Sequence, residues 1–448
     1  MPDRDTATDP ATAAPAAADT PAIDSPAIDS PAIDSPAIDT AVRYARPQPV
    51  GVFPLPAGFL LVPGGDDTAE LRRTLAAGRR PDTWPARLLA LELAYRGDIV
   101  GAADQLDGDD PIDRYNRFVL RPGGPPVEDL AQLRQALGAE LGILVDVVRF
   151  ALGDLVEPPP LAGETGEIAA LVHSTHAAHA MAAGRTGEAA GALGRAVAAA
   201  WEASPGLAAQ LLSTAADLRR SVEGPTDDVL ADLSTALAAL DATDLVVARA
   251  ELRLALGAAH QERARDDAAA LRTAVEHYLA ALRLISVDSA PELFAAIQVN
   301  LATAYLAMPM SQASDQLRIG VAIQGLRTAL AVYTPETHPE QWASTQLNLA
   351  NALVYAPSAH QKDNLIEAAA RYQQVIVARD RDTDPLGHAR ALANQGNALA
   401  HLGAYDQATA VLREARTIFE ESGAEDAALA VRGVLDEVAR RRGAPGPA

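Results

Sequence analysis

The sequence predicts an all-α protein built as a solenoid of stacked antiparallel helix pairs. A pattern of alanine, three residues, a large apolar residue, two residues and then alanine or valine recurs down the C-terminal half. Successive copies start 48, 46 and 40 residues apart. The four copies are Ala274/Tyr278/Ala281, Ala322/Leu326/Ala329, Ala368/Tyr372/Val375 and Ala408/Leu412/Ala415. Helical spacing that recurs at such intervals is typical of helical solenoids.

Composition supports the same fold class. Hydrophobic residues make up 49% of the 448-residue chain, whereas aromatic residues make up only 4%. Alanine therefore supplies much of the apolar surface, and it combines high helix propensity with a side chain small enough for close helix packing. Runs of β-branched residues in strict alternation, which would indicate strands, are scarce.

The N-terminal segment, residues 1–46, is predicted to be a disordered arm. The pentapeptide Pro21–Ser25 (PAIDS) is repeated almost perfectly up to Thr40. Proline at every fifth position prevents a helix, and the aspartates add like charge. Residues 47–66 are apolar but interrupted by proline and glycine. We expect them to lie extended against the first helices, in a region over 47–160 that caps the array.

Divergent helices follow, and glycines mark their turns. We expect a helix pair from Trp84 to Leu106 that turns at Gly97, and two helices within 127–156. Residues 161–243 are predicted to form divergent helical repeats, turning at Gly184 and Gly224. The expected ranges in this part are a pair over 167–200 and a pair over 205–240, with Thr226 or Asp227 as a cap.

The most regular region is 244–423. Pro291, Pro339 and Pro385 each precede an asparagine by nine residues: Asn300, Asn348 and Asn394. Proline suits the first turn of a helix, where its missing N–H costs nothing, so these prolines are expected to open three first helices. Ser289 and Asp384 are available as caps. In the last part, 424–448, a helix from Glu425 to about Arg442 is expected to cover the end of the stack.

Composition also limits the functional classes. Cysteine is absent, which excludes disulfides, thiol catalysis and zinc sites that need cysteine. The formal net charge of −22 disfavours nucleic acid as a partner. No signal peptide and no apolar run of membrane-spanning length are visible, so we expect a cytoplasmic protein without a membrane partner. The single lysine, Lys362, lacks the context of a phosphate loop.

The stretch Ala391–Ala408 resembles a tetratricopeptide repeat almost position for position. Leu392 takes the place of the large apolar residue that the family uses there, and Gly396 and Ala408 match its small residues. The units at 291–338 and 339–384 are similar to a longer bacterial variant of the repeat, best seen in Gln341–Leu353. The unit at 244–290 is a fainter copy.

This resemblance implies a right-handed superhelix whose first helices line a concave groove for peptides or protein elements. The residues that would face this groove are Ser344, Asn351, Tyr355, Arg390, Asn397 and His401. In members that bind chaperone tails, groove lysines grip a terminal carboxylate. Here Val299, Leu347 and Ala393 stand at those positions, which argues against that class of ligand.

Catalytic and metal-binding patterns are weak. His173, His176 and His179 form the densest cluster of possible metal ligands, but no carboxylate in H-E-x-x-H spacing accompanies them. Acidic pairs such as Asp227/Asp228 lie at helix starts, where they stabilise the helix dipole. No nucleophile elbow of the G-x-S-x-G type occurs. We therefore predict no catalytic residues, no metal and no cofactor.

The first hypothesis is a non-catalytic adaptor that binds a partner protein or peptide in its groove. The alternative is a ligand-responsive regulator that controls transcription or an enzyme in trans, and it would gain support if residues 47–160 formed a pocket against the repeats. A third hypothesis is a metal-dependent hydrolase centred on His173 and His176. The identity of the partner does not follow from the sequence.

Overall fold

The structure is a computed structural model, and it describes residues 48–50, 59–121, 130–161, 163–264, 268–309, 315–356 and 360–443. The arm predicted over 1–46 lies outside the described residues. So does the part of the apolar segment at 52–56. All statements below concern the described part of the chain.

Helices dominate these residues, and the all-α prediction is confirmed. The structure adds two short antiparallel strands, β1 (Gln48–Val50) and β2 (Leu60–Val62), in which Pro49 pairs with Leu61. Strand β2 is fully buried, in agreement with the extended course expected here. The pairing itself was not predicted, because three residues are too few to show alternation.

The described part of the chain divides into two compact units, one that ends at Ile285 and one that begins at Ser286. The division falls between Ile285 and Ser286, inside the array predicted over 244–423. The boundaries drawn from the sequence stay a prediction. Each unit is described by itself below.

The first unit begins with short helices around an apolar core that includes Leu75, Tyr115 and Leu144. The elements of this part are η1 (Asp66–Thr68), α2 (Ala69–Ala76), η2 (Ala86–Leu88), α3 (Leu89–Tyr95), α4 (Ile99–Asp104), α5 (Pro111–Leu120), α6 (Leu130–Ala136), α7 (Gly138–Leu141) and α8 (Ile143–Ala151). The predicted pair over 84–106 is confirmed as α3 and α4.

Two expectations for this part need correction. The region 127–156 holds three helices rather than two, because Gly138 adopts a φ of 78° and ends the run after α6. Helices α2 and α5 were not predicted. Both are shorter than three full turns, so their apolar periodicity is brief.

Regular helix pairs complete this unit. They are α9 (Gly166–Ala182), α10 (Thr186–Trp201), α11 (Pro205–Glu223), α12 (Asp227–Asp241), α13 (Val246–Arg263) and α14 (Ala268–Leu282). Gly184 and Gly224 adopt φ values of 71° and 82° at the predicted turns. The Thr226 hydroxyl caps α12 by accepting a hydrogen bond from the Val229 N–H at 3.3 Å.

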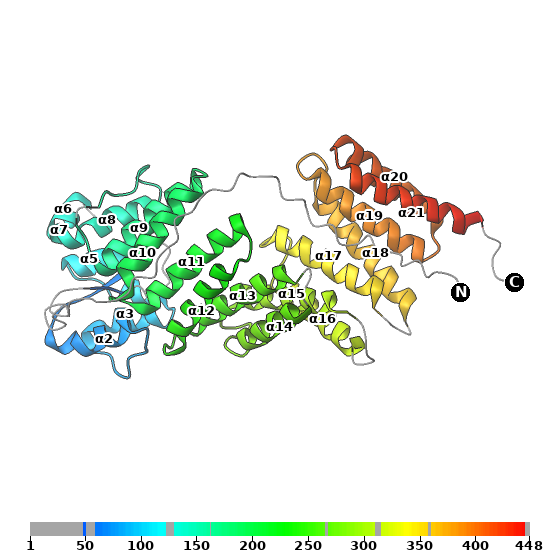
Figure 1. The fold of residues 1–448 in the computed structure, drawn as a ribbon. Helices are drawn as coiled ribbons and strands as arrows, with labels where there is room; N and C mark the ends of the chain where they lie inside the picture. The colour runs from blue at the N-terminus through cyan, green and yellow to red at the C-terminus, as the bar shows by residue number, and fades with distance from the viewer. Residues whose placement is uncertain are drawn as a thin grey trace. The chain divides into compact units, whose positions relative to one another are not determined.

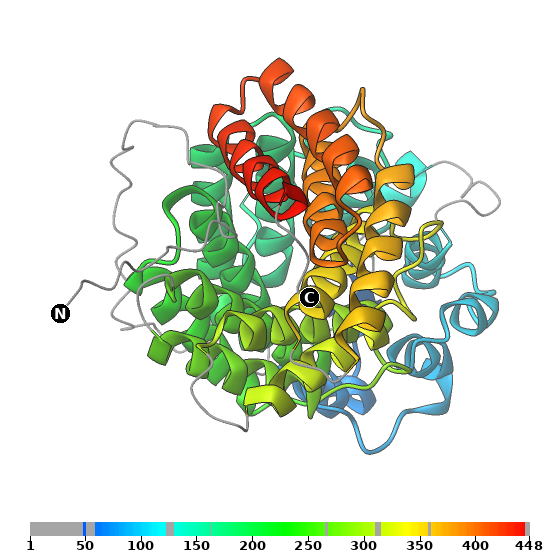
Figure 2. The same ribbon diagram turned by 90° about the vertical axis from the view of Figure 1, so that its right-hand side faces the viewer.

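The second unit consists of seven successive helices in its described part. They are α15 (Pro291–Ala307), α16 (Asp315–Ala329), α17 (Pro339–Tyr355), α18 (Gln361–Ala378), α19 (Pro385–His401), α20 (Tyr405–Glu421) and α21 (Glu425–Gly443). The pairs run antiparallel, and α20 and α21 lie side by side in both views (Figures 1 and 2).

The three prolines open helices as predicted: Pro291, Pro339 and Pro385 are the first residues of α15, α17 and α19. The Asp384 carboxylate caps α19 by accepting from the Gly387 N–H at 2.9 Å. The expected cap Ser289 is wrong. Ala290 is the N-cap of α15, and the Ser289 hydroxyl instead bonds the Ser286 backbone in the preceding turn.

The repeated alanine pattern forms the centre of each helix pair. None of its twelve residues is more than 2% exposed. Gly396 packs so closely against Leu412 that a Cβ would lie 2.5 Å from the Leu412 Cγ. Helices α15, α17 and α19 also contact one another in order. These are the packing relations of tetratricopeptide-like repeats, in which first helices form one continuous face.

Candidate functional site

The candidate site is the face that α15, α17 and α19 form together, here called the first-helix face. Its side chains lie 5, 9, 12 and 16 residues after the opening prolines, a spacing that places them on one side of each helix. The residues at these positions are Ala296, Asn300, Thr303 and Ala307; Ser344, Asn348, Asn351 and Tyr355; and Arg390, Asn394, Asn397 and His401. The six residues predicted to face a groove are all among them.

Asn351 stands at the centre of a hydrogen-bond cluster that joins two repeats. Its Oδ1 accepts from the hydroxyl of Tyr372 on α18 at 2.5 Å and from the Nδ2 of Asn394 on α19 at 3.5 Å. Tyr372 is 2% exposed, and burial raises the pKa of its hydroxyl, which stays a proton donor. Asn351 therefore holds the packing of α17, α18 and α19 together.

Tyr355 and Asn397 lie one helical turn further along. The Nδ2 of Asn397 donates to the Tyr355 hydroxyl at 3.4 Å, a long bond between α19 and α17. The Tyr355 side chain is 57% exposed, so most of its ring faces solvent. A large aromatic residue with an exposed ring and a weakly held hydroxyl is well suited to contact a partner.

Four other residues of this face have no hydrogen-bond or ionic partner within the described part of the chain. Ser344, Arg390 and His401 are exposed, and Asn348 is half-buried. The face thus presents a hydroxyl, an amide, a guanidinium and an imidazole whose hydrogen-bonding capacity is unused. Such groups can pair with the backbone or the acidic side chains of a bound segment.

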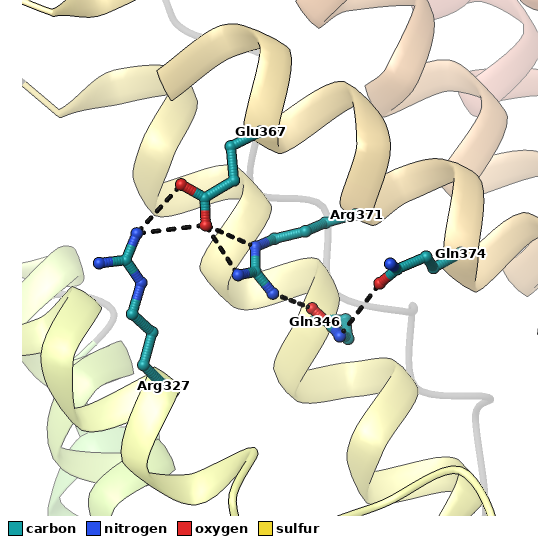
Figure 3. A network of polar contacts seen from close by, with 5 residues as sticks. All are labelled: Arg327, Gln346, Glu367, Arg371 and Gln374. Carbon is teal, nitrogen blue, oxygen red and sulfur yellow. Dashed lines mark hydrogen bonds and ion pairs between the residues drawn. The ribbon is translucent and has the colours of Figure 1, made fainter. Parts of the chain in front are cut away.

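A polar network links α17 to the neighbouring helices α16 and α18 (Figure 3). Glu367 on α18 accepts hydrogen bonds from Arg327 on α16 at 3.0 Å and from Arg371 at 2.7 Å. Arg371 also donates to the Oε1 of Gln346 on α17 at 2.6 Å. The Gln346 Nε2 in turn donates to Gln374 at 3.3 Å. The network thus links three successive helices.

The charge state of Glu367 follows from its partners. Burial raises the pKa of this carboxyl, but the hydrogen bond and the charge of Arg371, with the charge of Arg327, outweigh it, and the net pKa is lowered. Glu367 is therefore an ionised, doubly paired carboxylate that stabilises the helix stack. It is not placed to exchange a proton with a substrate.

A separate cavity of about 710 Å³ lies in the first unit. It is formed where the segment after α2 meets the turn between α12 and α13. Trp84 and Tyr95 line it with ring centroids 5.8 Å apart, and Arg80 donates its backbone N–H to the Asp244 carboxylate at 2.7 Å. Residues 80–96 thus form a pocket against the repeats, with aromatic and charged walls.

The histidines of the cluster contact different neighbours. The ring of His176 donates from Nε2 to the Pro159 carbonyl at 3.0 Å, because a carbonyl can only accept. His179 lies 3.6 Å from the Glu157 carboxylate. Across the described ranges, no three histidine, aspartate or glutamate side chains converge as metal ligands. The hydrolase hypothesis gains no support from this arrangement.

Sequence reasoning missed the Figure 3 network and the Trp84–Tyr95 cavity. One contact of the network was accessible, since Glu367 and Arg371 have the i, i+4 spacing of a helical ion pair. The cavity left no such signal, because Tyr95 and Asp244 are far apart in the sequence.

No family model and no curated protein matches the chain. Among solved structures, one similar chain is described as a Rap protein complexed with Competence and Sporulation Factor, with 12% identity and a TM-score of 0.43. This match covers 79% of the present chain and 97% of the other. A second is the TPR2AB-domain:pHSP90 complex of yeast Sti1, with 18% identity and a TM-score of 0.23. It covers 60% of the present chain and 98% of the other.

These TM-scores are low, and the tetratricopeptide-like character rests on the helix pairs themselves. No described helix has both the length and the apolar character needed to cross a membrane.

Proposed function

We propose that this tetratricopeptide-like chain is a non-catalytic adaptor that binds a protein or peptide segment on its first-helix face. The observation that supports the proposal most directly is the set of unpaired polar groups on the same face as the exposed Tyr355 ring. They lie on rigid helices, so little conformational entropy is lost when a partner binds.

The chemistry of the face indicates what kind of segment it takes. Asn348 and Asn397 offer amides that both donate and accept, as a peptide backbone does. Arg390 can pair with an acidic side chain of the partner, and Tyr355 can stack on an apolar one. The chain has a net charge of −22, yet the Arg390 guanidinium pairs with no carboxylate in the described part of the chain. An extended segment with one acidic and one apolar residue satisfies these groups.

The test is affinity capture from cell extract with the intact chain, followed by mass spectrometry, repeated with a Tyr355→Glu/Asn397→Glu variant. The new carboxylates would face any bound segment and repel its acidic group. We expect the dominant partner to be lost while the thermal midpoint changes little, because the bond between these residues is long and exposed. Retained capture would place the binding surface elsewhere.

A matched control introduces the same charge on second helices. Val377 on α18 is 78% exposed, and Gln407 on α20 is exposed and without a partner among the described residues. The Val377→Glu/Gln407→Glu variant should capture the partner as the unmodified chain does. A parallel bait that lacks residues 1–46 tests whether the PAIDS segment contributes, since a partner lost with that segment would assign the docking element to it.

A second candidate function is a ligand-responsive regulator, and the Trp84–Tyr95 cavity favours it. A pocket between residues 80–96 and the turn that opens α13 would let a small ligand alter how α13 is held. Quenching of Trp84 fluorescence by a ligand, absent in a Trp84→Phe variant, would support this function. A partner that binds equally well with and without such a ligand would favour the simple adaptor.

A further inference from the structure

A second, smaller cavity in the first unit has lining groups of a different kind. It measures about 460 Å³ and lies between α9, the first three turns of α10 and the loop at Glu157–Pro158. Its volume falls within the range of small-molecule sites. It belongs to the α9–α10 pair, far along the chain from the first-helix face, and neither proposed function uses it.

Basic side chains line this cavity from both helices. His176 and His179 come from α9, Arg185 is the residue before α10, and Arg195 lies on α10. The two acidic residues of the lining are engaged, because Glu188 pairs with Arg185 at 2.9 Å and Glu157 lies 3.6 Å from His179. Arg195 has no ionic or hydrogen-bond partner in the described ranges. The cavity thus keeps an unpaired cation in a chain with 59 acidic and 37 basic residues.

The space itself is created by glycine. A Cβ built on Gly187 would meet no atom within 4 Å, and one on Gly191 would meet only the Arg195 Nη1, at 3.6 Å. The exposed Arg195 guanidinium therefore lies close to Gly191, and both residues line the cavity. Nothing in the packing of α10 requires glycine at either position, since both have helical φ values and open surroundings.

A third histidine lies behind this lining. His173 is half-buried, and its Nδ1 is buried without a partner. Burial, then the charges of Arg195 and His176, lower the pKa of His173. Arg195 and the two imidazoles are thus close enough to repel one another's protons. An oxyanion among them would relieve this repulsion.

We propose that the α9–α10 cavity binds a small phosphorylated molecule, with the phosphate group on Arg195 and the His176 side of the cavity. A guanidinium offers paired N–H donors that match phosphate oxygens. The rest of the molecule occupies the space over Gly187 and Gly191. In neutral His176 the Nε2–H donates a hydrogen bond to the Pro159 carbonyl, which leaves Nδ1 without a proton. Nδ1 can therefore donate to the phosphate only when the ring is protonated.

The charged and titratable groups that line the cavity are His176 and His179 on α9, Arg185 just before α10, Glu188 and Arg195 on α10, and Glu157 in the loop. Among them, Arg195 is the arginine that has no ionic or hydrogen-bond partner within the described ranges, so we assign the phosphate to it.

The experiment follows the thermal midpoint and calorimetric binding of the full chain with inorganic phosphate, with potassium chloride at matched ionic strength as the reference. Phosphate also stabilises proteins by exclusion from their surface. A stabilisation by phosphate alone is therefore not sufficient, and the comparison of the variants distinguishes specific binding from this general effect. Arg195→Gln removes the cation, and Gly191→Leu fills part of the cavity. Arg283→Gln is the control, an exposed arginine directly after α14 with no partner among the described residues.

We expect saturable phosphate binding in the unmodified chain and in Arg283→Gln. It should be at least tenfold weaker in Arg195→Gln and in Gly191→Leu, with unchanged helical circular dichroism. Equal phosphate effects in all four proteins would overturn the proposal. Citrate tests whether the cavity prefers a carboxylate to a phosphate. Saturable binding of citrate without saturable binding of phosphate would also overturn the proposal. Because the first-helix face lies in the other unit, partner capture can succeed or fail independently of this result.

Discussion

The closest contact between two helices of a pair gives the sharpest test of the packing. Gly257 of α13 faces Tyr278 of α14, and a Cβ on Gly257 would lie 2.3 Å from the Tyr278 Cε1 and 2.7 Å from its Cδ1. Tyr278 is fully buried, and its hydroxyl donates to Gln261 at 2.9 Å. The ring therefore has neither the space nor the freedom to move aside.

The magnitude follows from two opposing terms. Replacing glycine by alanine inside a helix normally stabilises it by about 1 kcal/mol. Forcing a methyl group into a closely packed core costs about 1–3 kcal/mol. For Gly257→Ala the fixed Tyr278 ring places the second term in the upper part of its range, about 2–3 kcal/mol, so the expected net loss in the free energy of unfolding is about 1–2 kcal/mol. The control Gly191→Ala meets only an arginine tip, so it should gain about 1 kcal/mol.

The assay is urea unfolding followed by circular dichroism, with hydrogen exchange in α13 and α14 to locate the effect. The two alanine variants should shift the midpoint in opposite directions. In a Tyr278→Leu background the Gly257→Ala change should cost at least about 1 kcal/mol less, since the shorter side chain can move away. A Gly257→Ala protein as stable as the unmodified chain would refute this account of the contact.

Two further predictions concern polar groups in the cores of the two units. Asn351→Ala removes the acceptor of the buried Tyr372 hydroxyl and should lower the free energy of unfolding by about 1–3 kcal/mol. Asn351→Asp keeps an acceptor and should lower it less in the same urea titration. Equal losses in the two variants would contradict the role of that hydrogen bond. His277 stacks on His260 with ring centroids 5.6 Å apart, and burial, then the charges of His260 and Arg253, lower its pKa from 6.5 to about 4. The folded state therefore binds fewer protons than the unfolded state, and stability should fall as pH decreases from 6.5 towards 4, by about 1 kcal/mol after allowance for the half-exposed ring. A His277→Gln variant should lose this part of the pH dependence of its thermal midpoint, and an unchanged pH profile would count against it.

Much of the second unit could be predicted because its signals are local. The prolines at 291, 339 and 385 define the start of each first helix, and the alanine pattern defines the contact between partners. Both depend only on spacing within a helix, which the sequence shows directly. The six groove residues follow from the same register.

What these residues contact could not be predicted. Asn351 was expected to meet a partner, yet its amide is used by Tyr372 and Asn394, from the next two helices. Asn348, which was not among the six residues predicted to face a groove, is the residue whose amide has no partner within the described part of the chain. Which of two neighbouring asparagines bonds across the repeat depends on how far one helix slides along the other, and the sequence does not encode that offset visibly. The Trp84–Tyr95 cavity could not be predicted for the same reason, because it depends on how segments that are far apart in the sequence pack together.

The buried side-chain amide of Asn116 on α5 affects whether copies of this chain can pair through the edge of β2. Its Oδ1 accepts from the Leu61 N–H at 2.7 Å, and its Nδ2 donates to the Leu61 carbonyl at 2.9 Å. One side chain thereby imitates a neighbouring strand on the side of β2 that β1 leaves open. An open strand edge with apolar residues is a template for intermolecular pairing and aggregation. Asn116 closes that edge, so the chain can place an apolar extended segment beside its helices and remain protected from self-association through it.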